Sequence, residues 1–203
     1  MLSDRLYVFP SALTLFIFIV FFVTGCSTIR ETLPPRTATE QLLISAAVDR
    51  AIERLSFSVP VGAKIWLDTR NFTGYDAQYA ISAIKEYLLR QGGWLVNDEG
   101  MADFIVEIRA GALSIDENER FLGIPSFSFP IPLTGDFKFP ELALFRRDVL
   151  QGIAKFALFG YDAKSGALHA FSDPVYGNSN YTQWRVLFLG WTTSNMIPKN
   201  ALE

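Results

Sequence analysis

A continuous apolar segment from Leu6 to Val23 most constrains what this 203-residue chain can fold into. The segment counts 18 residues, the lower limit for a membrane-spanning helix, and Pro10 and Ser11 shorten its uninterrupted part to Ala12–Val23. That length is typical of the apolar region of a secretion signal, to which the free amino terminus and Arg5 give a weakly positive start. The sequence therefore predicts that residues 1–25 are removed and that residues 37–203 form the folded domain.

The four residues at the end of this segment carry a chemical signature. Val23-Thr24-Gly25-Cys26 resembles the lipobox of bacterial lipoproteins, in which the small residues admit a peptidase and the cysteine receives a diacylglycerol. The resemblance implies that Cys26 is the lipid attachment site and that residues 26–36, with Pro34-Pro35, are a tether to the membrane. The resemblance also implies a location. In the sorting rule of enteric lipoproteins, Asp after the lipidated cysteine retains a protein in the inner membrane, so Ser27 favours the outer membrane, on its periplasmic face. The alternative is an uncleaved helical anchor at residues 6–23.

Charge and composition exclude several classes of function. The net charge is −3 and the sequence pI is about 5.3, without a run of Lys or Arg, so the chain lacks the basic patch that nucleic acid requires. One cysteine and one histidine cannot supply the three or four protein ligands of the usual zinc sites. A serine-based triad would have to use His169, which lies in an apparent strand. We therefore expect no metal, no cofactor and no enzymatic activity.

Hydrophobic periodicity predicts the fold class. Thr37-Ala38-Thr39-Glu40 fits the capping box that opens a helix, and apolar residues at helical spacing then predict a helix over 38–55. A second such pattern predicts a helix over 76–91, ended by Gly92-Gly93. Short β-type patterns predict strands over 64–68, 94–97, 102–115, 149–161 and 167–172, and the strongly apolar stretch 181–191 is either a last strand or an interfacial segment. The sequence thus predicts a single α/β (α+β) domain, with two main helices packed on one mixed sheet.

Residues 121–145 differ in composition from everything around them. They hold six Phe (121, 127, 129, 137, 139 and 145) and four Pro (125, 130, 132 and 140). Because proline disfavours helices and interior strands, the segment is predicted to be a long apolar loop. Phe127 and Phe129 are then candidate contacts for a binding partner. In the alternative, the loop folds back over its own sheet and caps the core.

Two polar clusters are weaker candidates for a site. Asp68, Arg70 and Asn71 follow a strand and precede a helix, where ligands of open α/β sheets often bind, but a turn with its own capping network is the favoured explanation. Residues 116–120 read as a charged turn. Its carboxylates lack the number and spacing of oxygens that a calcium loop needs, so a solvated turn is favoured over a cation site.

Short stretches resemble known families. Residues 66–72, 102–106 and 159–166 are similar to the periplasmic α/β domain of the curli-secretion lipoproteins of the CsgG type, and to the N-terminal domain of TolB. Residues 35–41, Asp68-Thr69 and 122–125 resemble an uncharacterised family of bacterial lipoproteins. The resemblances imply the fold and the lipid, whereas the four prolines in 121–145 depart from the membrane-spanning insertions of the CsgG type.

Two functions follow as expectations. The first is a membrane-anchored envelope lipoprotein, held by its N-terminal lipid, that acts as an accessory or assembly protein and binds another envelope protein or itself. The second is a periplasmic ligand-binding or enzymatic domain that uses the loop after residues 64–68.

Overall fold

The structure, a computed structural model, describes residues 36–74, 76–131 and 135–197. Two helices are present, α2 (Ala38–Glu53) and α3 (Ala77–Arg90), with a short 3₁₀ helix η1 (Glu99–Met101). The strands are β1 (Lys64–Asp68), β2 (Trp94–Leu95), β3 (Phe104–Ile124), β4 (Phe127–Ile131), β5 (Gly135–Phe139), β6 (Leu142–Asp162), β7 (Leu168–Phe171), β8 (Val175–Val186) and β9 (Leu189–Ser194). The predicted secretion signal and Cys26 lie outside the described residues.

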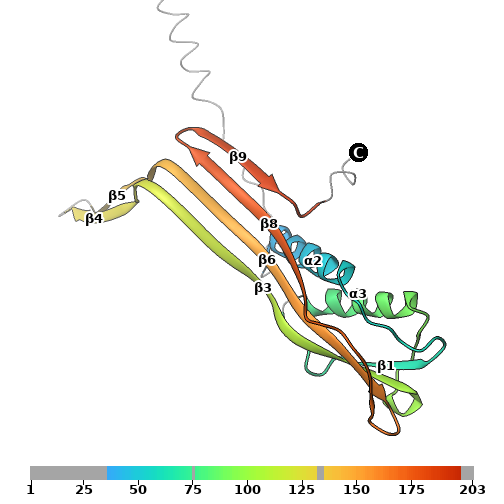
Figure 1. The fold of residues 1–203 in the computed structure, drawn as a ribbon. Coiled ribbons are helices and arrows are strands. Elements are labelled where there is room, and N and C mark those ends of the chain that lie inside the picture. The colour runs from blue at the N-terminus through green and yellow to red at the C-terminus, as the bar shows by residue number, and fades with distance from the viewer. Residues whose placement is uncertain (1–35, 75, 132–134, 198–203) are drawn as a thin grey trace, which may run out of the picture. The chain divides into compact units, whose positions relative to one another are not determined.

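Seven strands form one mixed sheet, which confirms the predicted α+β class (Figure 1). The strand order is β2-β1-β3-β6-β8-β9, and β7 pairs with β6 at one side. β1 runs parallel to both β2 and β3, and α3 connects β1 to β2, whereas all pairs among β3, β6, β7, β8 and β9 are antiparallel. β4 and β5 pair only with each other.

Helix α2 begins at the predicted capping box. The Thr37 backbone N–H donates to Glu40 Oε2 over 2.7 Å, and the Glu40 backbone N–H donates to Thr37 Oγ1 over 3.3 Å. The hydrogen bond from the Thr37 backbone also lowers the pKa of the Glu40 carboxyl. The helix ends at Glu53, two residues before the predicted boundary, because the backbone N–H groups of Arg54 and Leu55 bond three residues back in a tightened last turn.

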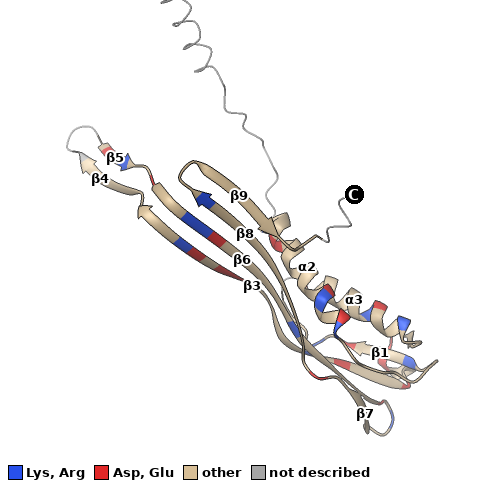
Figure 2. Ribbon diagram, turned by 45° about the horizontal axis from the view of Figure 1, so that its top comes forward, with Lys and Arg blue, Asp and Glu red and all other residues tan. Residues whose placement is uncertain are grey.

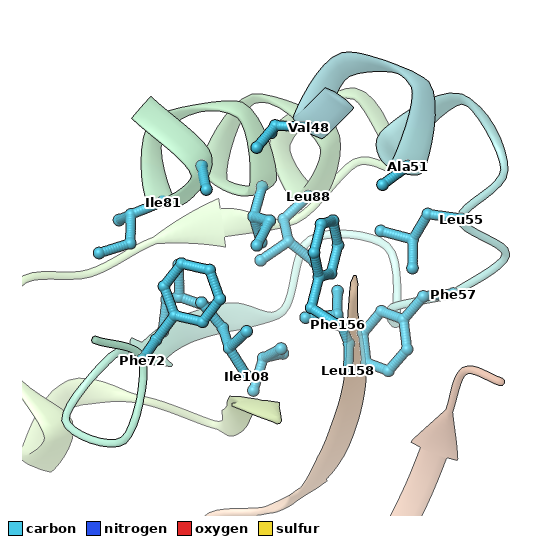
Figure 3. Packing of buried hydrophobic residues seen from close by; sticks show 14 of the residues in the cluster. Val48, Ala51, Leu55, Phe57, Phe72, Ile81, Leu88, Ile108, Phe156 and Leu158 are labelled. Carbon is cyan, nitrogen blue, oxygen red and sulfur yellow. The ribbon is translucent and has the colours of Figure 1, made fainter. Parts of the chain in front are cut away.

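The core lies between the two helices and the half of the sheet nearest β1 (Figure 3). Phe156 of β6 is 1% exposed, and its ring meets the edge of Phe72 at a centroid distance of 6.4 Å. Ile84 and Leu88 of α3 are fully buried in the same cluster. The helical stripes that the sequence shows therefore pack on this face of the sheet.

Helix α2 lies unusually close to the sheet because the strands beneath it present glycine and serine. A Cβ atom on Gly177 would overlap the carbonyl oxygen of Ala47, and one on Gly152 would overlap that of Leu43. Ser179, fully buried, donates its hydroxyl to the Leu43 carbonyl over 2.5 Å. Backbone-to-backbone contact of this kind is possible only where side chains are very small.

The charged turn predicted at residues 116–120 is wrong. These residues lie inside β3, where they pair with 147–151 of β6, so that β3 and β6 each continue for 21 residues. A run of charged residues usually indicates a solvent-exposed turn, which is why the sequence predicts one here. In the structure the side chains alternate between the two open faces of a ribbon, where carboxylates and guanidinium groups stay hydrated or pair across strands.

The long loop predicted at 121–145 is also wrong. The segment contains the end of β3, the hairpin of β4 and β5, and the start of β6. Pro125 and Pro140 lie at the joints between strands, and Pro130 lies in a two-stranded ribbon, both strands of which are edges. Proline is tolerated at such positions because its missing N–H can face away from the partner strand.

The strand predicted over 181–191 is a hairpin. β8 and β9 meet at Leu187 and Phe188, and Leu187 has a positive φ of 53°. β9 continues to Ser194, three residues beyond the predicted strand. The apolar run from Val186 to Leu189 concealed this turn, because it holds none of the Gly, Asn or Pro residues by which turns are recognised.

Candidate functional site

Asp68, one candidate from the sequence, is fully engaged by its own turn. Its side chain is almost completely buried, and its two oxygens accept hydrogen bonds from Nε and Nη2 of Arg70 over 2.6–3.0 Å. The backbone N–H of Arg70 also donates to Asp68 Oδ1, and the guanidinium lies 5.1 Å from the ring centre of Trp66. Asn71 donates to Glu107 over 3.2 Å instead of joining this group. The alternative of a capped turn is the one the geometry supports.

The Asp68–Arg70 pair predicts a dependence of stability on pH. Hydrogen bonds from the Arg70 side chain hold the pKa of Asp68 below its ordinary 3.8, so the folded state binds this proton less readily than the unfolded chain. The stabilisation is complete above that value and is lost as pH falls through the lower pKa of the folded state. We expect Asp68→Asn to be less stable than the original protein at pH 7, with a difference that shrinks below about pH 4. Urea unfolding at both pH values measures this, and an equal difference at both would contradict it.

A different group of residues stands out at the far end of the long strands, which we call the outer ribbon. It comprises residues 116–124 of β3, 142–151 of β6, 180–186 of β8 and all of β9. In Figure 1 this part of the sheet continues past α2 and α3. Because residues paired across antiparallel strands share a face, the registers assign every side chain of the outer ribbon to one of two faces.

The first face is polar and carries a salt-bridge network. Arg146 contacts Asp148 at 2.9 Å, Glu141 at 3.1 Å and Glu119 at 3.2 Å. Gln183, Arg185 and Thr192 join this face by register and line a shallow hollow beside the network. Figure 2 shows the corresponding bands of basic and acidic residues across β3 and β6, whereas β9 has no charged residue.

The second face is apolar and aromatic at the end of the ribbon. Its last row consists of Leu122, Phe145, Val186 and Leu189. The next row holds Trp184 and Trp191, whose stacked rings lie 6.0 Å apart, together with Arg147 at 4.6 Å from the centre of the Trp184 ring. The Arg147 Nε atom is buried and has no hydrogen-bond partner within the described ranges. Stacking on the indole is thus the contact that holds this guanidinium.

The hairpin of β4 and β5 repeats this two-faced arrangement. Phe127 pairs with Phe139 at a ring distance of 4.9 Å, and Phe129 pairs with Phe137 at 5.3 Å, so four phenyl rings share one face. Ser128 and Lys138 pair on the opposite face. Phe127, Phe129 and Phe137 are each almost half exposed. The two phenylalanines singled out from the sequence are therefore neighbours in an exposed aromatic surface.

The turn between β8 and β9 adds to the same end of the molecule, where the Leu187 backbone N–H donates to the Leu144 carbonyl over 3.1 Å. Phe188 at this turn is 97% exposed. Of the 22 exposed large apolar residues of the described chain, twelve lie within residues 122–144 and 186–191. The sequence indicates the second of these segments only as part of an apolar stretch over 181–191, and it does not reveal the exposed turn within the Val-Leu-Phe-Leu run beside Trp191. We call residues 122–131, 135–144 and 186–191 together the apolar end.

Other candidate chemistry is sparse in the part of the chain that the structure describes. No group of three or more His, Cys, Asp and Glu side chains is placed to hold a metal ion there. The imidazole of His169 meets the edge of the Phe104 ring at 5.3 Å. Within the same residues, no helix has both the length and the apolar character needed to cross a bilayer.

Fold and site together define an α+β domain that carries a long antiparallel β ribbon with an exposed aromatic end. Residues 21–190 match the model of a family of unknown function, DUF6655. The chain belongs to that family, and the matched range includes the whole of β3 to β8. A comparison with curated proteins gave no match.

Proposed function

We propose that this protein is a membrane-anchored envelope lipoprotein, lipidated at Cys26, and that it acts as an accessory or partner-binding protein rather than an enzyme. The apolar end is its contact surface. The outer membrane, on the periplasmic face, is the location that Ser27 favours. The Val-Thr-Gly-Cys sequence after an apolar segment supports the anchor.

The observation that carries the contact function is the exposure of the apolar end. Each aromatic or aliphatic side chain that moves from water into an apolar environment contributes about 1.5–3 kcal/mol. Twelve large apolar residues at one end of the ribbon are exposed to water in the isolated chain, so this stabilisation is gained only when an apolar partner covers them. Contiguous exposed apolar surface of this kind is characteristic of interaction sites in soluble domains.

The alternative, a ligand-binding or enzymatic site after β1, receives less support from the geometry. Both oxygens of Asp68 already accept hydrogen bonds from Arg70, and the guanidinium stacks on Trp66. A ligand at this point would have to displace the arginine from a buried carboxylate. Leaving such a group unpaired costs about 1–3 kcal/mol or more.

The contact surface is tested by placing a photoreactive amino acid at single positions of the β4–β5 hairpin in living cells. At Phe129, on the aromatic face, we expect crosslinked products with protein or lipid. At Lys138, on the opposite face of the same hairpin, we expect none, and this position is the matched control. Equal yields at both positions would show that contact is not specific to the aromatic face, and the absence of product at Phe129 would show that this face contacts nothing. Either result would overturn the contact surface.

The anchor is tested with Cys26→Ala. We expect the variant to carry no lipid by mass spectrometry and to keep its N-terminal segment, since processing requires the lipidated cysteine. Inhibition of the lipoprotein signal peptidase should produce the same longer form from the original sequence. If the original protein shows no lipid and no change in size under inhibition, residues 6–23 are an uncleaved anchor instead.

A further inference from the structure

We propose that the apolar end inserts into the interface of the same lipid bilayer that holds the N-terminal lipid. The proposal rests on lipidation of Cys26 for the anchor, and it names the partner of the contact surface as a lipid surface. The ribbon would then stand on the membrane by two attachments, one covalent and one formed by side chains. Three features support it: two come from the described residues and one from the length of the sequence before them.

The first feature is the order of side chains along the apolar face of the outer ribbon. Successive rows on one face of a sheet are two residues, or about 7 Å, apart. The rows, taken from the end inward, are Leu122, Phe145, Val186 and Leu189; then Arg120, Arg147, Trp184 and Trp191; then Asn118, Val149, Thr182 and Thr193; then Asp116, Gln151 and Asn180. Aliphatic and phenyl groups thus come first and indole and guanidinium groups second. Mainly polar groups follow, with one carboxylate, that of Asp116, in the fourth row.

This order matches the layers of a bilayer surface. Tryptophan concentrates at the boundary between acyl chains and headgroups, and arginine extends its charged end toward phosphate while its stem stays among apolar groups. The first carboxylate on this face, that of Asp116, lies three rows or about 20 Å behind the apolar row. The acidic groups nearer the end do not belong to this face. Glu119, Glu141 and Asp148 contact Arg146 of the polar face, and Asp136 lies on the face of the β4–β5 hairpin opposite the phenyl rings. The apolar face thus keeps carboxylates away from the headgroups that it would meet.

The second feature is the shape of what is exposed. Phe188 projects from the tip of a hairpin with 97% of its surface in solvent. A protein partner would need a matching pocket for each such ring, whereas acyl chains are fluid and need none. The β4–β5 hairpin, with four phenyl rings on one face and Ser128 and Lys138 on the other, has the amphipathic character of elements that lie in the membrane interface.

The third feature is the length of chain between the lipid site and the domain. Helix α2 runs antiparallel to β8, since Leu43 contacts Ser179 whereas Arg54 contacts Tyr176. The start of α2 therefore points toward the apolar end, with Arg36 about 10 Å beyond Leu43 by helical rise. Phe188 lies nine residues beyond Ser179, or about 30 Å along the strand direction.

Along the ribbon, Arg36 and Phe188 are thus separated by about 20 Å, the difference between these two distances. Ten residues join Cys26 to Arg36, and a chain of that length reaches at most about 36 Å. A lipid on Cys26 can therefore sit in the same leaflet that Phe188 enters. A tether half as long would not permit both attachments.

The experiment uses the single cysteine of the sequence. In the lipidated protein the thiol of Cys26 is blocked, so Phe188→Cys introduces one reactive site for an environment-sensitive fluorophore. Val61→Cys is the matched control, because Val61 is 89% exposed and lies beside Gly92, at the end of the sheet that carries the helices. Full-length lipidated protein is reconstituted in vesicles of phosphatidylcholine, alone or mixed with phosphatidylglycerol.

Iodide in the aqueous phase is expected to quench the label at residue 188 roughly tenfold less than the label at residue 61. The free energy of burying one aromatic side chain corresponds to a ratio of inserted to water-exposed protein of about ten or more. Lipids that carry a nitroxide in the acyl chain are expected to quench only the label at residue 188. Both results should hold with and without phosphatidylglycerol. Protection that requires phosphatidylglycerol would overturn insertion in favour of headgroup attraction.

Two further outcomes would also overturn the proposal. Equal quenching of both labels by iodide means that the apolar end stays in water. Protection of residue 188 from iodide and from the nitroxide lipid alike means that protein covers it, either a second copy or another chain. The mass of the lipid on Cys26, measured on the same sample, separates the two proposals. An unmodified Cys26 with residue 188 in the lipid would remove the anchor and leave the insertion.

Discussion

Gly177→Ala is expected to destabilise the protein by about 3 kcal/mol or more, although it adds one methyl group. The new Cβ would overlap the carbonyl oxygen of Ala47 and lie 2.7 Å from the backbone nitrogen of Ala51. Both are main-chain atoms of α2 and cannot rotate away, so the helix has to lift from the sheet. Lifting it exposes Ile44 and Val48, which are fully buried. Urea unfolding followed by circular dichroism measures the loss, against a typical total stability of about 5–15 kcal/mol.

Gly190→Ala is the matched control for this prediction. Gly190 also lies in an antiparallel strand, but its added Cβ would meet nothing closer than the Trp184 carbonyl oxygen at 3.5 Å, an ordinary contact. We expect its free energy of unfolding to stay within a few tenths of a kcal/mol of that of the original protein. If Gly177→Ala behaves like Gly190→Ala, α2 does not rest directly on β8 and the packing described above is incorrect.

The part of the fold that buries a core was predictable from the sequence. Helices at 38–55 and 76–91 and the strand at 64–68 were predicted to within two residues of α2, α3 and β1. In each of them, side chains that enter the core have to recur at the period of the helix or strand. The capping box at Thr37 and Glu40 marked the start of α2 for an equally local reason.

The outer ribbon was not predictable in the same way. Asp116 to Arg120 and the prolines of residues 121–145 break the apolar alternation that identifies a strand, because neither face of the ribbon has to be buried in this chain. Their strand structure depends on pairing with residues 27 to 35 positions away, from Arg120 with Arg147 to Asp116 with Gln151. Pairing at such separation leaves no signal in a short window of sequence.

The candidate sites differ in the same way: those formed by neighbouring residues were predictable, and those formed by distant residues were not. Asp68, Arg70 and Asn71 were recognised from their place after a strand, and the pairing of Asp68 with Arg70 follows from their spacing of two residues. Phe127 and Phe129 were recognised from composition alone, because six phenylalanines in 25 residues are unusual anywhere. The Trp184–Trp191 stack and Arg147 were missed, since their meeting depends on the turn at Leu187 and Phe188, which the sequence does not mark.

Phe156→Ala is expected to lower the free energy of unfolding by about 3–5 kcal/mol, whereas the double substitution of Phe127→Ser and Phe129→Ser is expected to leave it almost unchanged. Phe156 is 1% exposed and fills the core between the helices and the sheet, so alanine leaves a cavity there. Phe127 and Phe129 are almost half exposed, and their rings pair with other rings of their own hairpin. Thermal unfolding by circular dichroism compares the two variants.

A melting temperature for the double variant as low as that of Phe156→Ala would mean that the β4–β5 hairpin supports the core. The contact function proposed for it would then have to be abandoned. If the double variant instead melts like the original protein and no longer forms crosslinks from the aromatic face, the rings act in binding and not in folding.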